Sequence, residues 1–297
     1  MAIKWYPGHM NKARRLISET MRTIDVVIEV LDARLPASSA NPLLAELRGN
    51  KPCIKLLNKA DLADPEVTRQ WGVFFERQHG VKAIALEAKS RASVPRLLKL
   101  IRSLAPHRGV PGKPLRVMVV GIPNVGKSTL INTLAGRAIA KVGDKPAITK
   151  SQQHIDLKNG IVLSDTPGIL WPNLADQDGA YRLAASGAIG DTVMEYPEVA
   201  LFVLDYLARR YPEGLKTRYR LTELPPTPSD MLHEIGRRRG CLVAGGEVDR
   251  HRAAEILLFE LRGGKIGRIS LEVPDDQQTA GDDGGESGEP PEDVIPG

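Results

Sequence analysis

The sequence has few cysteines and no long apolar run, and both absences exclude classes of protein. Its 297 residues include two cysteines, Cys53 and Cys241, which lie far apart and outside any CxxC pattern. Neither a disulfide framework nor a cysteine metal cage is indicated. No apolar stretch approaches the roughly 18 residues of a membrane span. Residues 1–10 resemble neither a signal peptide nor a transit peptide, so we expect a cytoplasmic protein without membrane contact.

Basic residues are absent from the C-terminal end. Residues 275–297 hold eight acidic side chains and no Lys or Arg. Since the whole chain has a formal net charge of +5 and this segment contributes −8, residues 1–274 carry +13. A body this basic favours a polyanionic partner such as nucleic acid, although good solubility alone would also explain it. The Gly-, Pro- and Asp-rich tail, residues 274–297, is expected to be disordered.

Short β-branched runs that end in polar loops recur in the first half of the chain. Strands are expected at 24–31, 53–57, 83–86 and 115–120, and a hairpin over 154–157 and 161–164 around Asn159-Gly160. Helical stretches separate most of these strands, which indicates a mostly parallel sheet covered on both faces. Such sheets bind ligands beyond the carboxyl ends of their strands.

Helical periodicity surrounds this region on both sides. A helix is expected over residues 10–23, and the pattern becomes mainly helical after residue 175. Ser229 and Asp249 are candidate N-caps for two of the later helices. The pair Gly263-Gly264 is expected to end the last one.

A phosphate-binding loop follows the strand over 115–120. Gly121-Ile-Pro-Asn-Val-Gly-Lys-Ser128 fits the pattern GxxxxGK[ST], and the residues after it favour a helix. The glycines let backbone N–H groups point at one anion. Lys127 is expected to reach the β- and γ-phosphates, and Ser128 to bind Mg²⁺. The candidate nucleotide-binding residues of this loop are Asn124, Val125, Gly126, Lys127, Ser128 and Thr129.

A guanine-specificity motif comes about sixty residues before the phosphate loop, whereas it follows that loop in an ordinary small G protein. Asn58-Lys59-Ala60-Asp61 is an NKxD sequence. The Asp61 carboxylate can accept hydrogen bonds from guanine N1–H and the 2-amino group, and adenine lacks both donors. Lys59 can lie over the base, and Asn58 can brace the loop. A metabolic P-loop ATPase or kinase is therefore disfavoured.

The remaining parts of a GTP site are weaker signals. A DxxG element begins at Asp165, which would hold Mg²⁺ through a water, and ends at Gly168, whose N–H would contact the γ-phosphate. Thr149 is the candidate for the threonine that closes on Mg²⁺. The Ala88 N–H, beside Lys89, is predicted to contact guanine O6.

Catalysis needs a group that orients the attacking water, and the glutamine that Ras-like proteins place after DxxG is replaced by Ile169. Lys127 and Thr149 remain catalytic candidates. His9 can accept a water proton as a neutral imidazole, although a lone histidine near the N-terminus is more often structural. Asn124 could ligate K⁺ beside the phosphates, or it could only brace the loop.

In this rotated order the motifs resemble the circularly permuted ribosome biogenesis GTPase A family, also called YlqF or RbgA. The matching segments are Trp5–Met10, Ile24–Glu29, Leu31–Arg34, Asn58–Asp61, Gly121–Thr129 and Asp165–Pro172. The resemblance implies a bacterial factor that binds the immature large ribosomal subunit in its GTP form. It also implies potassium-stimulated hydrolysis and a role for the histidine matched by His9. The sequence departs from the family at Ala147, where glycine is usual, and at Glu87, where Ser or Asn is usual.

The sequence therefore predicts an α/β protein in three parts. A circularly permuted P-loop GTPase domain with a mostly parallel sheet occupies residues 1–175, and a smaller, mainly helical domain occupies 176–273, before the tail at 274–297. The family resemblance implies that the helical domain contacts ribosomal RNA. The leading function is a GTP hydrolase that assists assembly of the large (50S) subunit and is released by hydrolysis. The alternative is an RNA-binding scaffold with a GTP site of negligible turnover.

Overall fold

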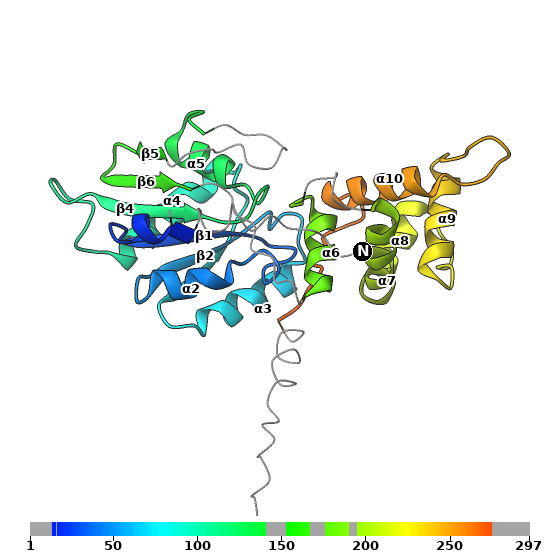
Figure 1. Ribbon diagram of the computed structural model, residues 1–297, viewed down its shortest axis with the longest axis horizontal. Helices are drawn as coiled ribbons and strands as arrows, with labels where there is room; N and C mark the ends of the chain where they lie inside the picture. The colour runs from blue at the N-terminus through cyan, green and yellow to red at the C-terminus, as the bar shows by residue number, and fades with distance from the viewer. Residues whose placement is uncertain (1–13, 16, 141–152, 167–175, 190–194, 275–297) are drawn as a thin grey trace, which may run out of the picture.

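A six-stranded sheet forms the centre of the first part of the molecule (Figure 1). The computed structural model describes residues 14–15, 17–140, 153–166, 176–189 and 195–274. The strands are β1 (Val26–Asp32), β2 (Cys53–Asn58), β3 (Val81–Ala85), β4 (Leu115–Val120), β5 (Gln153–Asp156) and β6 (Ile161–Asp165). Their order is β3-β2-β1-β4-β6-β5. All neighbours are parallel except the hairpin β5–β6, as the sequence predicts.

Helices cover both faces of this sheet. They are α2 (Pro42–Arg48), α3 (Pro65–Glu76), the short 3₁₀ turn η1 (Arg91–Ser93), α4 (Val94–Leu104) and α5 (Lys127–Ala135). Residues of α4 and α5 share one apolar cluster with one face of the sheet, and residues of α2 and α3 share a second cluster with the other. Residues 14–15 and 17–21 are helical, within the helix expected over 10–23, and Ile17 and Met21 pack into the second cluster.

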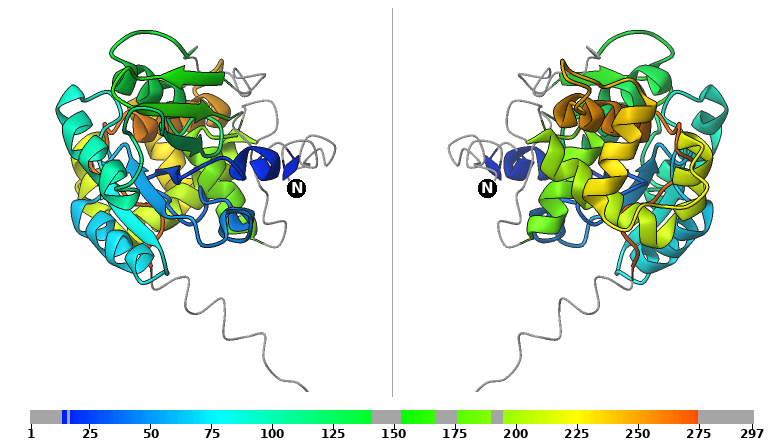
Figure 2. Two further views of the ribbon diagram at one scale, coloured as in Figure 1. Left: turned by 90° about the vertical axis from the view of Figure 1, so that its left-hand side faces the viewer. Right: turned by 90° about the vertical axis from the view of Figure 1, so that its right-hand side faces the viewer.

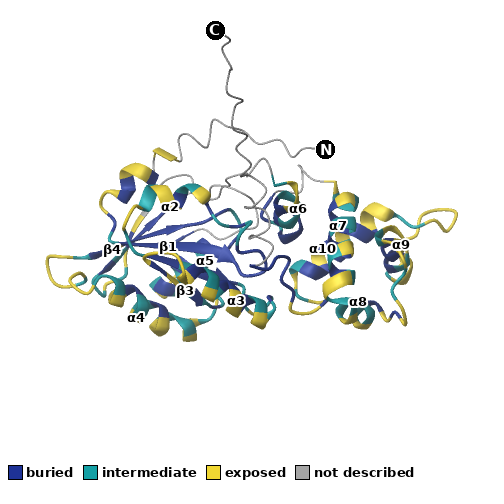
Figure 3. Ribbon diagram, turned by 90° about the horizontal axis from the view of Figure 1, so that it is seen from below, coloured by how far each residue is buried: buried dark blue, intermediate teal, exposed yellow. Residues whose placement is uncertain are grey.

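Strand β1 shows why the sheet must be covered twice. Every residue of the strand is buried, and the strands form the dark centre of Figure 3. Alternate side chains point to opposite faces. Ile28 and Val30 therefore belong to the cluster with α4 and α5, whereas Val27 and Leu31 belong to the cluster with α2 and α3.

A group of helices forms the other part of the molecule. It contains α6 (Gln177–Ser186), α7 (Tyr196–Arg210), α8 (Pro212–Tyr219), α9 (Pro228–Arg238) and α10 (Arg250–Arg262). Views along the long axis put the sheet in front from one end and α7 to α10 in front from the other (Figure 2). After α10 the chain returns to the first part of the molecule. There the Leu271 N–H donates to the carbonyl of Arg34, just after β1, over 2.6 Å. Within the described ranges, none of the helices has the length and hydrophobicity that a membrane crossing requires.

The helix termini confirm one predicted cap and correct another. Asp249 is the N-cap of α10, and Gly263 ends that helix, as expected. Ser229 is not a cap, because α9 begins two residues earlier than predicted. Thr227 is the N-cap, and its hydroxyl accepts a hydrogen bond from the Asp230 N–H over 3.1 Å. Pro228 explains the shift, since proline fits the first helical position and lacks the N–H that would otherwise need a partner.

Substitution of Thr227 tests this correction. Thr227→Ala should lower the free energy of unfolding by about 1 kcal/mol, because a donor at the start of α9 loses its acceptor. Ser229→Ala, two residues away, should change it by less than about 0.5 kcal/mol. Urea unfolding followed by circular dichroism measures both values. A larger loss for Ser229→Ala than for Thr227→Ala would contradict the assignment.

Candidate guanine nucleotide site

The predicted motifs meet at one edge of the sheet. The NKxD motif follows β2, Ala88 lies just beyond β3, the phosphate loop follows β4, and Asp165 ends β6. These four strands run in the same direction, so their carboxyl ends lie at the same edge. The other three predicted site residues, His9, Thr149 and Gly168, lie outside the described residues.

The Asn58 side chain joins three of these loops. It is 3% exposed. Its amide nitrogen donates to the Val125 carbonyl in the phosphate loop over 2.6 Å, and its oxygen accepts from the Ala88 N–H over 2.8 Å. Gly126 has a φ of +99°, and a Cβ there would overlap the Asn58 amide nitrogen. The phosphate loop, the guanine motif and the loop that carries Ala88 (residues 87–90, the base loop) therefore form one packed unit.

The base loop is held somewhat differently from the sequence prediction. The sequence predicts that the Ala88 N–H contacts guanine O6, and in this structure it donates to the Asn58 side-chain oxygen. The contact with guanine remains a prediction, in which O6 would share this donor. Asp61 and Lys89 are exposed at the ends of their loops, while Lys59 and Ala60 are partly covered.

The phosphate loop leads directly into α5. Gly126 precedes the helix in a left-handed conformation, and no side chain caps the first turn. Backbone N–H groups at such an end attract anions. The Lys127 side chain is buried, and its ammonium donates to the Ile122 carbonyl over 2.7 Å. Burial lowers the pKa of Lys127 to about 8, although the nearby charge of Asp165 opposes this shift.

A buried ion cluster at the end of β1 supports the guanine motif, although its residues Asp32 and Arg34 are not among the predicted site residues. The Asp32 carboxylate, 2% exposed, accepts hydrogen bonds from the Arg34 guanidinium over 2.9 and 2.8 Å. It also accepts one from the Lys59 ammonium over 2.8 Å. Burial alone would raise the pKa of Asp32, but the charges of Arg34 and Lys59 hold it well below its usual range. The position of Asp32 at the end of a buried strand was the available signal.

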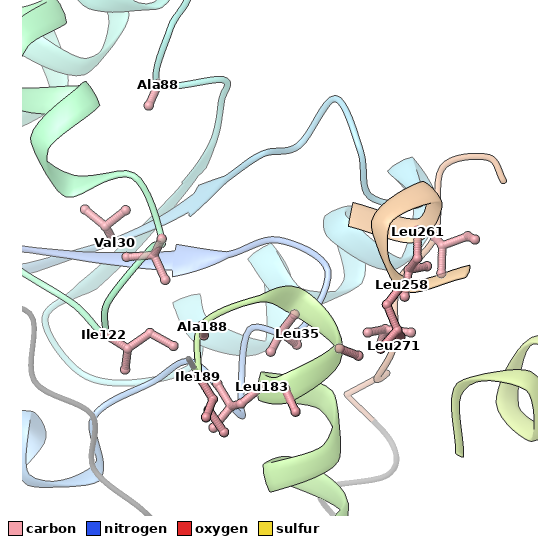
Figure 4. Close-up of a cluster of buried hydrophobic side chains, with 14 of the residues drawn as sticks. Val30, Leu35, Ala88, Ile122, Leu183, Ala188, Ile189, Leu258, Leu261 and Leu271 are labelled. Atoms are coloured by element: carbon pink, nitrogen blue, oxygen red, sulfur yellow. The ribbon is translucent and has the colours of Figure 1, made fainter. Parts of the chain in front are cut away.

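The carboxyl end of α6 contacts the phosphate loop. The last carbonyl groups of a helix have no partner within it. Here the Gly187 carbonyl accepts a hydrogen bond from the Asn124 amide nitrogen over 2.9 Å, while the Arg262 guanidinium donates to the carbonyls of Ala184 and Ala185. Apolar packing accompanies these bonds, with Ile122 beside Ala188 and Ile189 in Figure 4. A residue of the phosphate loop and one of α10 thus bind the same helix end.

This fold and the order of its motifs define a circularly permuted P-loop GTPase. A family model described as "50S ribosome-binding GTPase" matches residues 116–231. Ribosome biogenesis GTPase A of Priestia megaterium is 46% identical, over 94% of this chain and 99% of that protein. The same-named Thermotoga maritima protein is 35% identical, over 92% and 95%. The crystal structure of GNP-bound YlqF from T. maritima matches with a TM-score of 0.63 and 31% identity, over 89% of this chain and 99% of that one.

The chain therefore belongs to the ribosome biogenesis GTPase A family. It is a GTP hydrolase of ribosome assembly. As a GTPase, it depends on Mg²⁺. The expected fold class, a permuted GTPase domain with a mostly parallel sheet followed by helices, is confirmed.

Replacement of Asn58 tests the bridge between the loops. Asn58→Ala removes both hydrogen bonds and leaves the Ala88 N–H without its acceptor, at a cost of about 1–3 kcal/mol. We expect GDP affinity to fall at least about tenfold, which is measured by titration with a fluorescent GDP analogue. The matched control is Asn41→Ala, which removes the buried N-cap of α2. It should lower stability and leave affinity within about twofold; equal affinity losses in both variants would contradict the bridge.

The pKa of Lys127 predicts a pH dependence of nucleotide binding. Because the pKa of Lys127 lies at about 8 in the structure, the fraction of protein molecules with a neutral Lys127 grows as the pH rises above that value. A bound polyphosphate favours the charged ammonium and raises the pKa. Binding should therefore take up protons at pH 8.5 and almost none through this group at pH 7, and affinity should fall as the pH rises. Calorimetry in two buffers of different ionisation enthalpy measures the uptake; equal uptake at both pH values would contradict the prediction.

Proposed function

We propose that this GTPase acts on the precursor of the large (50S) ribosomal subunit. In this proposal the GTP form binds the immature particle, including its rRNA, and hydrolysis drives release. The printed description of the matching family model and the names of the relatives support the choice of partner. The charge of residues 1–274, with the acidic tail excluded, is consistent with an RNA-rich particle.

One observation carries the nucleotide part of the proposal. The Asn58 amide binds the backbone of both the phosphate loop and the base loop. A single guanosine nucleotide could then contact Asp61 with its base and Lys127 with its phosphates. Ser128, Thr129, Val125 and Gly126 would line the phosphate side, and Lys59, Ala60, Ala88 and Lys89 the base side.

We propose that Ser128, Asp165 and Thr149 hold Mg²⁺, which neutralises the developing charge on the phosphates. The two described residues offer oxygen donors, a hydroxyl at the start of α5 and a buried carboxylate at the end of β6. Mg²⁺ is usually bound through one or two carboxylates together with substrate phosphates.

We propose Asn124 as a ligand of K⁺. Its amide nitrogen donates to the Gly187 carbonyl, and the amide oxygen is the atom of this side chain that can ligate a cation. Hydrogen bonding at one end and ion binding at the other reinforce each other. Such an ion would assist the charge stabilisation assigned to Lys127 and Thr149. Gly168 would contact the γ-phosphate, and His9 is the candidate for orienting the attacking water.

The alternative of an RNA-binding scaffold with negligible turnover is not favoured, because the relatives over the full length carry the name of a GTPase. The helical domain, proposed to span residues 176–273, would supply the RNA contact. The candidates are Arg209, Arg210, Arg237 and Arg238, which are exposed, and Arg239, which is partly buried.

Co-sedimentation tests the proposed partner and the nucleotide dependence together. The protein should pellet with precursors of the large subunit in the presence of a non-hydrolysable GTP analogue, and much less with GDP. Binding should weaken steeply between low and high salt, because phosphate contacts release counterions. Mature small subunits serve as the control particle. Equal pelleting with both nucleotides, or equal pelleting with small subunits, would contradict the proposal.

A further inference from the structure

The segment after α10, residues 266–273, crosses from the helical domain to the guanine motif, and we call it the C-terminal strap. It lies in the orange-red part of the chain in Figure 1. It forms no helix or strand, yet most of its side chains are at most 5% exposed: Ile266, Ile269, Ser270, Leu271, Glu272 and Val273. Figure 4 shows Leu271 close to Leu258 and Leu261 of α10. Buried irregular backbone needs hydrogen-bond partners, and the strap finds them in the GTPase domain.

The strap forms hydrogen bonds with the backbone of the guanine motif and of the two residues that follow it. The exposed Arg268 side chain donates from Nε to the Ala63 carbonyl over 3.0 Å and from its terminal nitrogen to the Ala60 carbonyl over 2.8 Å. The Ile269 N–H donates to the Leu62 carbonyl over 2.9 Å. These carbonyl groups lie on both sides of Asp61 in the chain. The backbone that carries the Asp61 carboxylate is thus fixed by the strap.

A buried carboxylate anchors the far end of the strap. Glu272 is fully buried, and it accepts hydrogen bonds from the backbone N–H groups of Ala37 and Ser38 and from the Ser38 hydroxyl. Its own carbonyl accepts from the Trp71 indole over 3.2 Å. Burial raises the pKa of Glu272, while the Ser38 hydrogen bond and the charge of Arg182 oppose the shift. These partners fix the position of Glu272, and with it the C-terminal end of the strap, against Ala37, Ser38 and Trp71.

The near end of the strap belongs to the helical domain. A Cβ at Gly214 in α8 would lie 2.7 Å from the Ile266 carbonyl, so α8 packs directly on the start of the strap. Tyr211 lies between α7 and α8. Its hydroxyl accepts a hydrogen bond from the Ser270 N–H over 3.2 Å and donates one to the Asp64 carboxylate over 3.3 Å. A displacement of α8 would therefore reach the residues next to Asp61 through a short, continuous series of contacts.

We propose that Arg268 is a positioning residue for the guanine contact of Asp61, and that the strap makes this contact depend on the docking of the helical domain. The inference rests on the proposed role of Asp61 as the guanine ligand. A partner that moves the helical domain would then weaken the hold on the base and so promote release of the nucleotide. This route acts on the base and is therefore separate from the proposed contact of Gly168 with the γ-phosphate.

The test compares GDP with IDP, whose base lacks the 2-amino group that Asp61 is proposed to bind. We choose the ratio of the two affinities in the full-length protein as the readout, since a general loss of stability would lower both affinities together. Arg268→Ala should lower the preference for GDP about fivefold or more, and Arg268→Lys should restore part of it. Gly214→Ala should lower it in the same direction, because the added methyl group displaces the Ile266 carbonyl. Alanine also favours the helix, so we expect this variant to fold.

The matched control is Arg69→Ala. Arg69 is also exposed and also makes two hydrogen bonds, but both go to Glu66 in its own helix, α3. Its removal should leave the preference unchanged. An unchanged preference in Arg268→Ala would overturn the positioning role. A loss in Arg268→Ala without one in folded Gly214→Ala would overturn the dependence on the helical domain. A wild-type protein that binds GDP and IDP equally would instead refute the guanine role of Asp61.

Discussion

The carboxamide of Asn58 is the interaction on which the site depends. It is buried, and a buried amide without partners destabilises a fold by about 1–3 kcal/mol. Its two partners, Val125 and Ala88, lie 67 and 30 residues away in the chain. Only the assembled fold brings both within reach. A side chain that satisfies its own hydrogen bonds therefore also sets the relative positions of the phosphate loop and the guanine motif.

The permuted order of the motifs changes what the nucleotide site is connected to. Strand β6, which ends at Asp165, is the last strand along the described part of the chain, and the next described element is α6 of the helical domain. The phosphate loop contacts that domain through Asn124 and Gly187, and the guanine motif contacts it through the strap. The phosphate loop and the guanine motif therefore both contact the part of the chain that follows the sheet. This arrangement suits a switch whose output is the position of a second domain.

Much of the fold and part of the site follow from local sequence patterns. The β-branched runs and the Asn159-Gly160 turn predict the strands and the hairpin correctly, because burial on both faces and turn chemistry are local properties. The placement of Asn58 near the phosphate loop follows from the motifs and the rule for parallel sheets. The prediction of Ser229 as a cap is wrong, because Pro228 is a local signal that favours the preceding residue, Thr227, as the N-cap.

Other features depend on contacts between distant segments. The role of Arg34 cannot be read from its neighbours in sequence, since it depends on Asp32 being buried beside Lys59. The apolar and polar residues of the strap follow neither a helical nor a strand period, so no pattern predicts that the strap is buried or that Arg268 reaches Ala60.

A crystal structure of this protein with Mg²⁺ and a non-hydrolysable GTP analogue tests the central claim most directly. The account predicts one nucleotide with its guanine within about 3 Å of the Asp61 carboxylate and its phosphates within about 3 Å of the Lys127 ammonium. A nucleotide bound to Lys127 with its base turned away from Asp61 would contradict it.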